Sequence, residues 1–206
     1  PSTTTTNAVS LYTRAITLTA DNNVTTYGTA LALGTTGYTI TSGSLGSGDA
    51  ITGVTLEQAS HTTVPSNQTA GTYSGVTDGI LVSAAVGTGG FDTTNYSISY
   101  LPGTLTINKA PLGISIAATY NGTTTVTPSA FTLTGLQNSE TVTSLSSVTL
   151  HDANVASNGT NYVTGLTSGG GTADLAANYA ITVSRNATPS TTTTNAVSLY
   201  TRAITL

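Results

Sequence analysis

The amino-acid sequence predicts an all-β protein made of tandem immunoglobulin-like β-sandwich domains placed end to end. Threonine supplies 48 of the 206 residues, and this stiff, β-branched residue is favoured in strands. Methionine is absent, and lysine and arginine together number only four, so strong helix formers are scarce. Short alternating segments separated by Gly, Asn, Asp and Ser are typical of strands joined by turns. We expect about seven short strands in each domain and negligible helix, with β-grasp-like domains as the alternative.

Alternation along the first half predicts strands with one apolar face. In the segment 15–20, Ile16 and Leu18 alternate with threonines, and in the segment 96–101, apolar residues at 96, 98 and 100 alternate with serines. Successive side chains of a strand point to opposite faces, so each segment presents one apolar face to a core.

The middle of the chain predicts a very short connection between two domains. Leu105 and Ile107 end one apolar pattern, and Leu112 begins the next directly after Lys109-Ala110-Pro111. Proline fixes one backbone angle and the connection is too short to act as a flexible tether. We therefore expect adjacent domains to have little hinge freedom.

The first eighteen residues, 1–18, recur letter for letter as the last eighteen, 189–206. An unbroken match at this offset is the signature of a tandem repeat of 188 residues sampled once with an overlap. We interpret 1–12 as the closing strand of a preceding repeat, 13–109 as a first β domain, 110–202 as a second, and 203–206 as the start of the next repeat. The segment 8–13 should therefore lack a partner within this chain, whereas its counterpart 196–201 should be paired.

The two halves share an ordered series of turn motifs, which indicates that the two domains are related. A Tyr-Gly turn, an acidic turn, a Gly-Thr-Tyr segment and an Asn-Tyr segment occur in the same order in both halves. The residues that we single out as structural turn positions are Tyr27, Gly28, Asp49, Tyr73, Asn95, Tyr96, Tyr120, Gly122, Asn178 and Tyr179.

This order of motifs resembles the MBG (YGX-type) and YDG-type repeat domains of bacterial surface adhesins, which occur in large filamentous-haemagglutinin-like proteins. The first domain is closer to the YGX pattern. The second has Tyr120-Asn121-Gly122 where the YDG type has Tyr-Asp-Gly, and Glu140 stands at the position that corresponds to Asp49. The resemblance implies a secreted, repetitive cell-surface filament of bacterial origin, and it implies no catalytic activity.

Charge and composition argue against several classes of function. The net charge is −4, and nucleic-acid binding needs clustered Lys and Arg that this sequence lacks. The longest apolar runs are far shorter than the roughly 20 residues that span a bilayer, so we expect no membrane span in this sequence and targeting signals outside it. The two histidines, His61 and His151, have no Cys or second His at ligand spacing, and we predict solvated loop residues and no enzyme activity.

We expect no cofactor, and bound calcium is the alternative that we retain. Asp21 and Asn22 supply oxygen atoms near a domain junction, and Asp49 could converge on them in space. Calcium needs six to eight oxygen ligands, and hydrogen bonds from these side chains to the backbone of turns are the competing interpretation. A covalent cross-link is disfavoured because Lys109, the single lysine, lies at the domain junction.

Together these observations predict a structural repeat of a long extracellular filament or adhesin stalk on the bacterial surface. Its partners would be identical repeats in the same polymer, with lateral contacts between filaments as a further expectation. The alternative is an adhesin module that binds a glycan, a matrix component or a neighbouring cell. Such sites depend heavily on Trp, Tyr and Arg, and the sequence contains no Trp.

Overall fold

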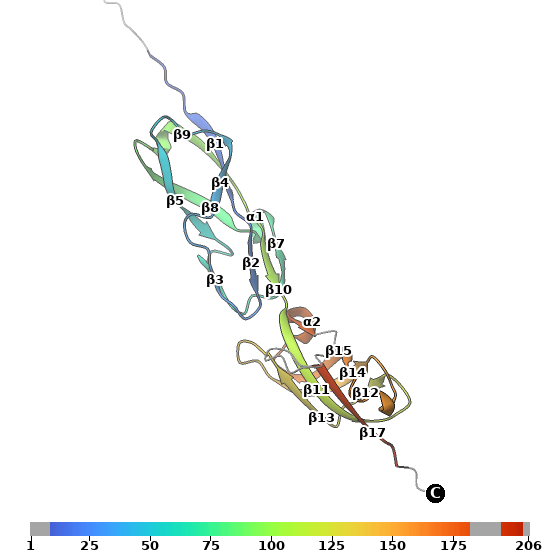
Figure 1. The fold of residues 1–206 in the computed structure, drawn as a ribbon. Helices are drawn as coiled ribbons and strands as arrows, with labels where there is room; N and C mark the ends of the chain where they lie inside the picture. The colour runs from blue at the N-terminus through green and yellow to red at the C-terminus, as the bar shows by residue number, and fades with distance from the viewer. Residues whose placement is uncertain (1–8, 182–194, 204–206) are drawn as a thin grey trace, which may run out of the picture. The chain divides into compact units, whose positions relative to one another are not determined.

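The structure is a computed structural model that describes residues 9–181 and 195–203 (Figure 1). Strands predominate in it. Helix in the described residues is limited to α1 (Gly75–Asp78) and α2 (Leu175–Asn178), with 3₁₀ turns η1 (Thr93–Asn95) and η2 (Val155–Ser157). Each α-helix has four residues, barely more than one turn. The prediction of an all-β chain with negligible helix is confirmed.

The strands fall on either side of Lys109. Those before it are β1 (Arg14–Ala20), β2 (Asn23–Thr26), β3 (Leu31–Ala32), β4 (Tyr38–Gly43), β5 (Ala50–Glu57), β6 (Thr63–Val64), β7 (Gly71–Tyr73), β8 (Leu81–Thr88), β9 (Tyr96–Leu101) and β10 (Leu105–Asn108). Those after it are β11 (Ala110–Thr119), β12 (Thr125–Val126), β13 (Ala130–Thr134), β14 (Val142–Leu150), β15 (Val163–Gly171), β16 (Tyr179–Ile181) and β17 (Asn195–Tyr200).

The chain forms two compact units. The first unit comprises Pro1–Asn23, Leu31–Val64 and Thr72–Thr106. The second unit comprises Val24–Ala30, Pro65–Gly71 and Ile107–Leu206. Two short segments from early in the sequence therefore belong to the second unit, and we describe each unit by itself.

In the first unit, β1 lies between β4 and β9. It pairs antiparallel with β4 and parallel with β9, with Arg14 opposite Tyr96. The predicted alternation of β1 is confirmed, because Ile16 and Leu18 are buried while the intervening threonines are half-buried. The long pair β5 and β8 is antiparallel, as is the short pair β3 and β6.

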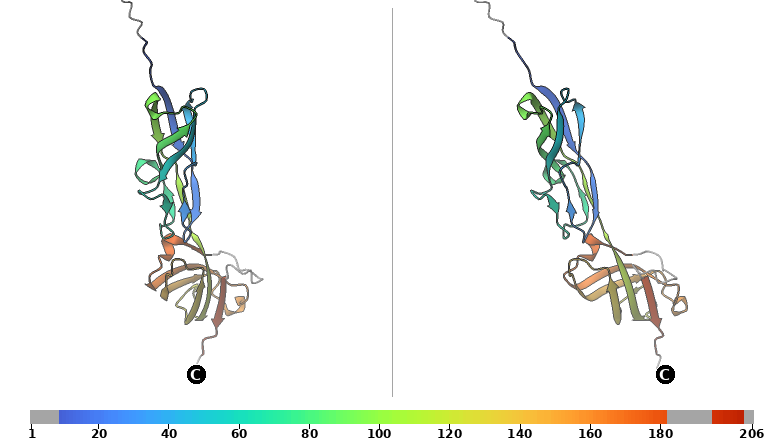
Figure 2. Two further views of the ribbon diagram at one scale, coloured as in Figure 1. Left: turned by 90° about the vertical axis from the view of Figure 1, so that its left-hand side faces the viewer. Right: turned by 60° about the vertical axis from the view of Figure 1, so that its left-hand side comes forward.

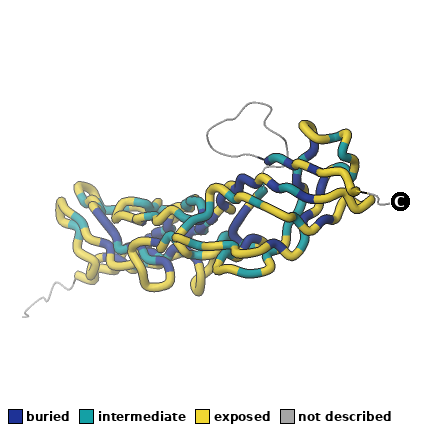
Figure 3. The backbone as a smooth tube through the Cα atoms, turned by 90° about the horizontal axis from the view of Figure 1, so that it is seen from below, coloured by how far each residue is buried: buried dark blue, intermediate teal, exposed yellow. Residues whose placement is uncertain are grey.

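The apolar face that the sequence predicts for 96–101 is formed only in part. Tyr96 is buried, Ile98 is half-buried and Tyr100 is exposed. The Tyr100 hydroxyl accepts a hydrogen bond from the backbone N–H of Ala85, so the hydroxyl of this exposed ring is bound to the backbone. Figure 3 shows the buried residues running along the inside of each unit and the exposed ones on its outside.

In the second unit, β11 is the central strand. It pairs antiparallel with β13 along one edge. Along the other edge it pairs parallel with β16 at residues 110–112 and then parallel with β17 at residues 114–119. Figures 1 and 2 show β17 beside β11. A second sheet of this unit has the order β12-β14-β15. The chain also forms a three-stranded sheet of order β2-β10-β7.

In both halves, a motif tyrosine is hydrogen-bonded to the last residue of a closing strand. The backbone N–H of Tyr27 donates to the carbonyl of Asn108, the last residue of β10, and the backbone N–H of Tyr120 donates to the carbonyl of Tyr200, the last residue of β17, each at 2.9 Å. One residue, Lys109, separates β10 from β11. The connection is shorter than the predicted Lys109-Ala110-Pro111, because Ala110 and Pro111 already belong to β11.

The repeated segment has different structures in its two positions. Residues 9–13 form no strand, and Val9 and Leu11 are 83% and 92% exposed. In the second position, Val197 and Leu199 are 6% and 2% exposed and belong to β17. The predicted contrast holds for the residues that the structure describes, which leave out Ala8.

Candidate functional site

The calcium candidates lie at different places in the first unit. Asp21 follows the last residue of β1, and its Oδ1 accepts a hydrogen bond from the Thr39 hydroxyl at 2.9 Å. Asn22 Oδ1 accepts a hydrogen bond from the backbone N–H of Thr104 at 2.7 Å. Asp49 contacts Tyr96, which pairs with the first residue of β1. Seven residues of strand span roughly 23 Å, so the structure does not bring Asp49 together with Asp21 and Asn22.

Other ionisable side chains support turns. Asp92 caps η1 and accepts hydrogen bonds from the backbone N–H and the hydroxyl of Thr94, which lower its pKa. Within the described ranges 9–181 and 195–203, no group of three His, Cys, Asp or Glu residues is placed to hold a metal ion. Both His61 and His151 are exposed, and Lys109 Nζ donates to the carbonyl of Ala176 at 2.5 Å.

A turn that ends in a carboxylate packs against a tyrosine in the first unit. The backbone N–H of Asp49 donates to the carbonyl of Gly46 at 3.2 Å, which closes the turn 46–49. The Tyr96 hydroxyl donates to Asp49 Oδ2 at 2.5 Å and accepts a hydrogen bond from the Gly46 N–H at 2.7 Å. The hydrogen bond to Asp49 is the main cause of a raised pKa of Tyr96.

The second unit repeats this arrangement. The backbone N–H of Glu140 donates to the carbonyl of Gln137 at 2.8 Å, which closes the turn 137–140. The Tyr179 hydroxyl donates to Glu140 Oε2 and accepts a hydrogen bond from the Gln137 N–H at 2.8 Å. We name each arrangement a tyrosine–carboxylate turn: Gly46–Asp49 with Tyr96, and Gln137–Glu140 with Tyr179.

The turn of the second unit holds a further tyrosine. The Tyr27 hydroxyl donates to the other carboxylate oxygen, Glu140 Oε1, at 2.5 Å. The rings of Tyr27 and Tyr179 meet edge to face with their centroids 5.6 Å apart. Burial is the main cause of a raised pKa for both tyrosines, and the hydrogen bond to Glu140 is the second cause. Glu140 thus bridges two phenols that both remain protonated at neutral pH.

Neighbouring contacts within the second unit hold the same turn. Ser66 and Asn138 bond twice, through Ser66 Oγ to Asn138 Oδ1 at 2.8 Å and Asn138 Nδ2 to the Ser66 carbonyl at 3.2 Å. Asn178 Oδ1 accepts a hydrogen bond from the Ala70 N–H at 3.0 Å. Gly28 has φ +93°, and a Cβ there would lie 2.3 Å from Gln137 Oε1. The positive φ therefore favours glycine at this position, and a larger residue would also have to displace the flexible Gln137 side chain.

The remaining motif residues lie in turns and strands. Gly122 has φ +85° in the turn after β11. Asn95 ends η1, where its N–H donates to the carbonyl of Asp92, and Tyr73 is the last residue of β7. Sequence reasoning missed the bonds from Tyr96 and Tyr179 to the acidic turns. The signal available was the matched order of an acidic turn and an Asn-Tyr segment in both halves.

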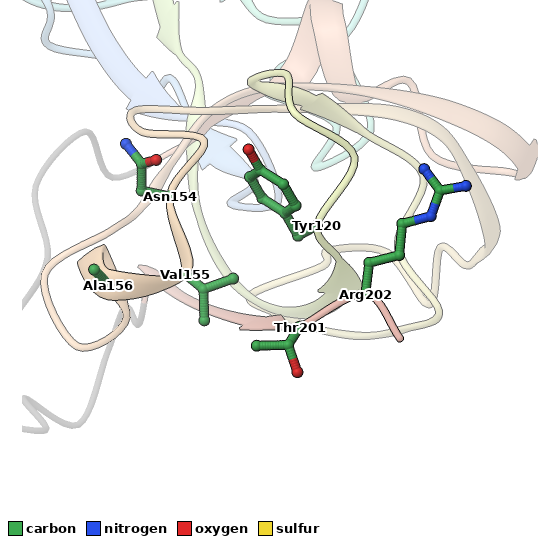
Figure 4. Close-up of a pocket in the computed structure, with 6 residues that line it drawn as sticks. All are labelled: Tyr120, Asn154, Val155, Ala156, Thr201 and Arg202. Carbon is green, nitrogen blue, oxygen red and sulfur yellow. The ribbon is translucent and has the colours of Figure 1, made fainter. Parts of the chain in front are cut away.

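A pocket of about 460 Å³ lies where the second unit ends. It is lined by Tyr120, Asn154, Val155, Ala156, Thr201 and Arg202. Figure 4 shows the Tyr120 ring in the middle of this group, with Arg202 on one side and Asn154 on the other. Tyr120 is 38% exposed, whereas Tyr27, which occupies the corresponding motif position, is 4% exposed.

The edge strand β17 is the second candidate interaction site. Asn195 is buried, and its amide bonds to both backbone groups of Val163, accepting from the N–H at 2.8 Å and donating to the carbonyl at 2.9 Å. Val197 and Leu199 complete the core beside β11. β17 therefore supplies a buried, hydrogen-bonded amide and two apolar side chains to the core of the second unit.

No protein-family model, curated protein or solved structure matches this chain. No helix in the described part of the chain has the length and apolar character needed to cross a membrane. A proposal for the function therefore depends on the contacts of the chain itself.

Proposed function

We propose that this chain is a 188-residue structural repeat, with an overlap, of a long extracellular filament or adhesin stalk on a bacterial surface. The observation that carries the proposal is the double occurrence of one segment, buried as β17 in one position and exposed at 9–12 in the other. An apolar strand that fits a groove, and is present again with no groove to fill, is what a repeat cut with an overlap produces.

The ends of the chain support the proposal. After β17 ends at Tyr200, the next residues are Thr201 and Arg202, and Arg202 matches Arg14, the first residue of β1. The same spacing occurs inside the chain, where β10 ends at Asn108 and β11 begins after Lys109. A closing strand followed after one residue by an opening strand is therefore a recurring connection.

We propose that each repeat contains two immunoglobulin-like sandwich domains with boundaries near 13–109 and 110–202. In support, β1 and β11 are each flanked by one antiparallel and one parallel strand. The β-grasp alternative is disfavoured, because neither α-helix exceeds four residues. The order of turn motifs keeps MBG-type and YDG-type adhesin repeats as the family hypothesis.

Composition supports the extracellular location. The chain has no Cys and no Met, so little in it can be oxidised, and four basic residues leave few sites for trypsin-like proteases. Its surface is kept polar by hydroxyl groups more than by charges, since only 6% of residues are charged. This composition suits a protein that persists outside the cell.

A ligand-binding module is the second candidate. The observation that favours it is the pocket that contains Tyr120 and Arg202, because Tyr and Arg are enriched at binding hot spots. This candidate predicts saturable binding of a glycan or matrix component by a single repeat, which an array of such ligands measures directly.

Recombinant chains with one, two and four copies, joined through the shared 18 residues, test the structural proposal. We expect every copy to fold as the single chain does. Electron microscopy should show filaments whose length grows by a constant step, about 70 to 80 Å for two sandwich domains with strands of roughly 8 residues. Collapsed particles or unevenly bent chains without a regular step would contradict the proposal.

A further inference from the structure

We propose that the pocket around Tyr120 is the docking surface for the turn 46–49 of the following copy of this chain, with the Tyr120 hydroxyl donating to the Asp49 carboxylate. The inference rests on the proposed function, because it requires a following copy. It would give each repeat a second tyrosine–carboxylate contact of the kind that Glu140 makes with Tyr27.

The contact made by Glu140 is the template. Its two oxygens accept hydrogen bonds from two tyrosines: Tyr179, which follows it in the same half of the sequence, and Tyr27, which comes from the Tyr-Gly motif of the preceding half. The segment 65–71, also from the preceding half, reaches Asn138 and Asn178 of the same region.

Tyr120 has the same place in the second half that Tyr27 has in the first. Each belongs to a Tyr-Gly or Tyr-Asn-Gly motif, and each donates its N–H to the carbonyl of the last residue of a closing strand, Asn108 or Tyr200. The loop that accompanies Tyr120 in the pocket, 154–156, precedes a Gly-Thr-Asn-Tyr segment, as the loop 65–70 precedes a Gly-Thr-Tyr segment.

Asp49 has the same place as Glu140, with one difference. Its Oδ2 accepts the hydrogen bond from Tyr96, as Glu140 Oε2 accepts the one from Tyr179. Among the described residues, none donates a hydrogen bond to Asp49 Oδ1, whereas the matching oxygen of Glu140 is occupied by Tyr27. The tyrosine that would fill Oδ1 would have to come from a preceding copy.

An arginine links the pocket to this turn. Arg14 Nη1 donates to the carbonyl of Leu45 at 2.9 Å, directly before the turn 46–49. Arg202 is the same residue one repeat later, and it lines the pocket beside Tyr120. In a longer chain, the arginine that holds the turn of the following copy would therefore already lie at the edge of the pocket.

The exposed surface fits this occupant. The pocket combines apolar groups of Tyr120, Val155 and Ala156 with polar groups of Asn154 and Thr201, and Tyr200 beside it is 58% exposed. Docking of the turn would bury the Tyr120 ring as Tyr27 is buried. The partner is thus another copy of this chain and not a free small molecule.

The test uses a two-copy chain in which Leu206 is followed by residues 19–206, so that only the first-copy Tyr120 faces a following copy. Tyr120→Phe in the first copy should lower the unfolding temperature by about 2 to 4 °C, the shift expected for one net hydrogen bond in a chain of this size. The same substitution in the last copy is the matched control and should have no effect. First-copy Tyr120→Phe and second-copy Asp49→Asn should be combined as well. The double variant should lower the unfolding temperature by less than the sum of the decreases that the two single substitutions cause.

Tyrosine nitration gives a second readout. With the last-copy Tyr120 replaced by Phe, the remaining Tyr120 should be nitrated at least several-fold more slowly than Tyr120 of the single chain. Equal nitration rates, or equal effects of Tyr120→Phe in the two copies, would overturn the inference while both copies still fold and the proposed function stands. Failure of the second copy to fold would instead overturn the proposed function. A pocket built for a small ligand would leave Tyr120 reactive in the two-copy chain.

Discussion

Residues 9–12 and residues 197–200 have the same sequence, Val-Ser-Leu-Tyr, but only the second copy is a strand. Leu199 is 2% exposed beside β11, whereas Leu11 is 92% exposed and unpaired. Strand preference reflects the surface on which a segment packs more than the segment itself. The first copy has the same strand-forming residues, but no strand in the described part of the chain pairs with it. Three predictions, in order of falling effect, test this difference, and a fourth tests the tyrosine contacts of Glu140 in the same unit.

Deletion of 189–206 should abolish the cooperative unfolding of the second unit, because β11 loses its parallel partner and the core loses Val197 and Leu199. Deletion of 1–12 is the matched control, since it removes the same closing-strand sequence where its described residues, 9–12, form no strand, and it should leave unfolding unchanged. Calorimetry and hydrogen exchange measure both. A peptide of residues 1–13, which has the sequence of 189–201, should restore protection of β11 in the first variant, and its failure to do so would show that this edge is completed only by a strand of the same chain.

Leu199→Ala should destabilise the second unit by about 2 to 5 kcal/mol, the usual cost of a large cavity in a packed core. Leu11→Ala changes the corresponding residue in the exposed copy. The free energy of unfolding of this variant should stay within about 0.5 kcal/mol of that of the unsubstituted chain. Denaturant unfolding followed by circular dichroism measures the difference. Similar losses for both substitutions would mean that residues 9–12 also bury their apolar side chains.

Asn195→Ala should lower the free energy of unfolding of the second unit by about 1 to 3 kcal/mol, because the N–H and carbonyl of Val163 would lose their amide partner in a buried site. Asn195→Asp retains the acceptor but removes the donor, so it is the informative companion variant. Hydrogen exchange at the Val163 amide should rise in the Ala variant. Unchanged protection there would show that other groups satisfy this backbone.

Alkaline pH should weaken the second unit. Tyr27 and Tyr179 have pKa values raised above the ordinary value of 10.0 in the folded chain, so folding favours their neutral forms. Their contribution is complete below pH 10 and is lost as the pH rises through the folded pKa values. Tyr179→Phe should flatten the fall in unfolding free energy above pH 10, and an unchanged slope would contradict a raised pKa of Tyr179 in the folded chain. Tyrosine absorbance at 295 nm follows the titration in parallel.

Local patterns were sufficient to predict several parts of the fold. The alternation around Ile16 and Leu18 identified β1, and the apolar pattern on both sides of Lys109 predicted a short connection there, although Ala110 and Pro111 were assigned to the connection and belong to β11. These features depend on side-chain period and on turn residues, both of which are visible in a short window. The absence of long helix followed from the composition in the same way.

Long-range pairing could not be predicted in the same way. The parallel pairing of β1 with β9 joins residues far apart in the sequence, and no local pattern specifies it. The bonds of Tyr96 to Asp49 and of Tyr179 to Glu140 span 47 and 39 residues. The sequence marked all four as turn or strand positions, but a hydroxyl and a carboxylate meet only after the strands have paired.

The parallel pairing of β17 with β11 has a consequence for a chain held under tension. The chain enters β11 at Ala110 and leaves β17 at Tyr200, at opposite ends of two strands that run in the same direction. A pull on the two termini would slide these strands past each other and load their hydrogen bonds together, in shear, whereas an antiparallel hairpin pulled at its open end unzips one bond at a time. The edge that completes the second unit is thus also the edge that would resist extension.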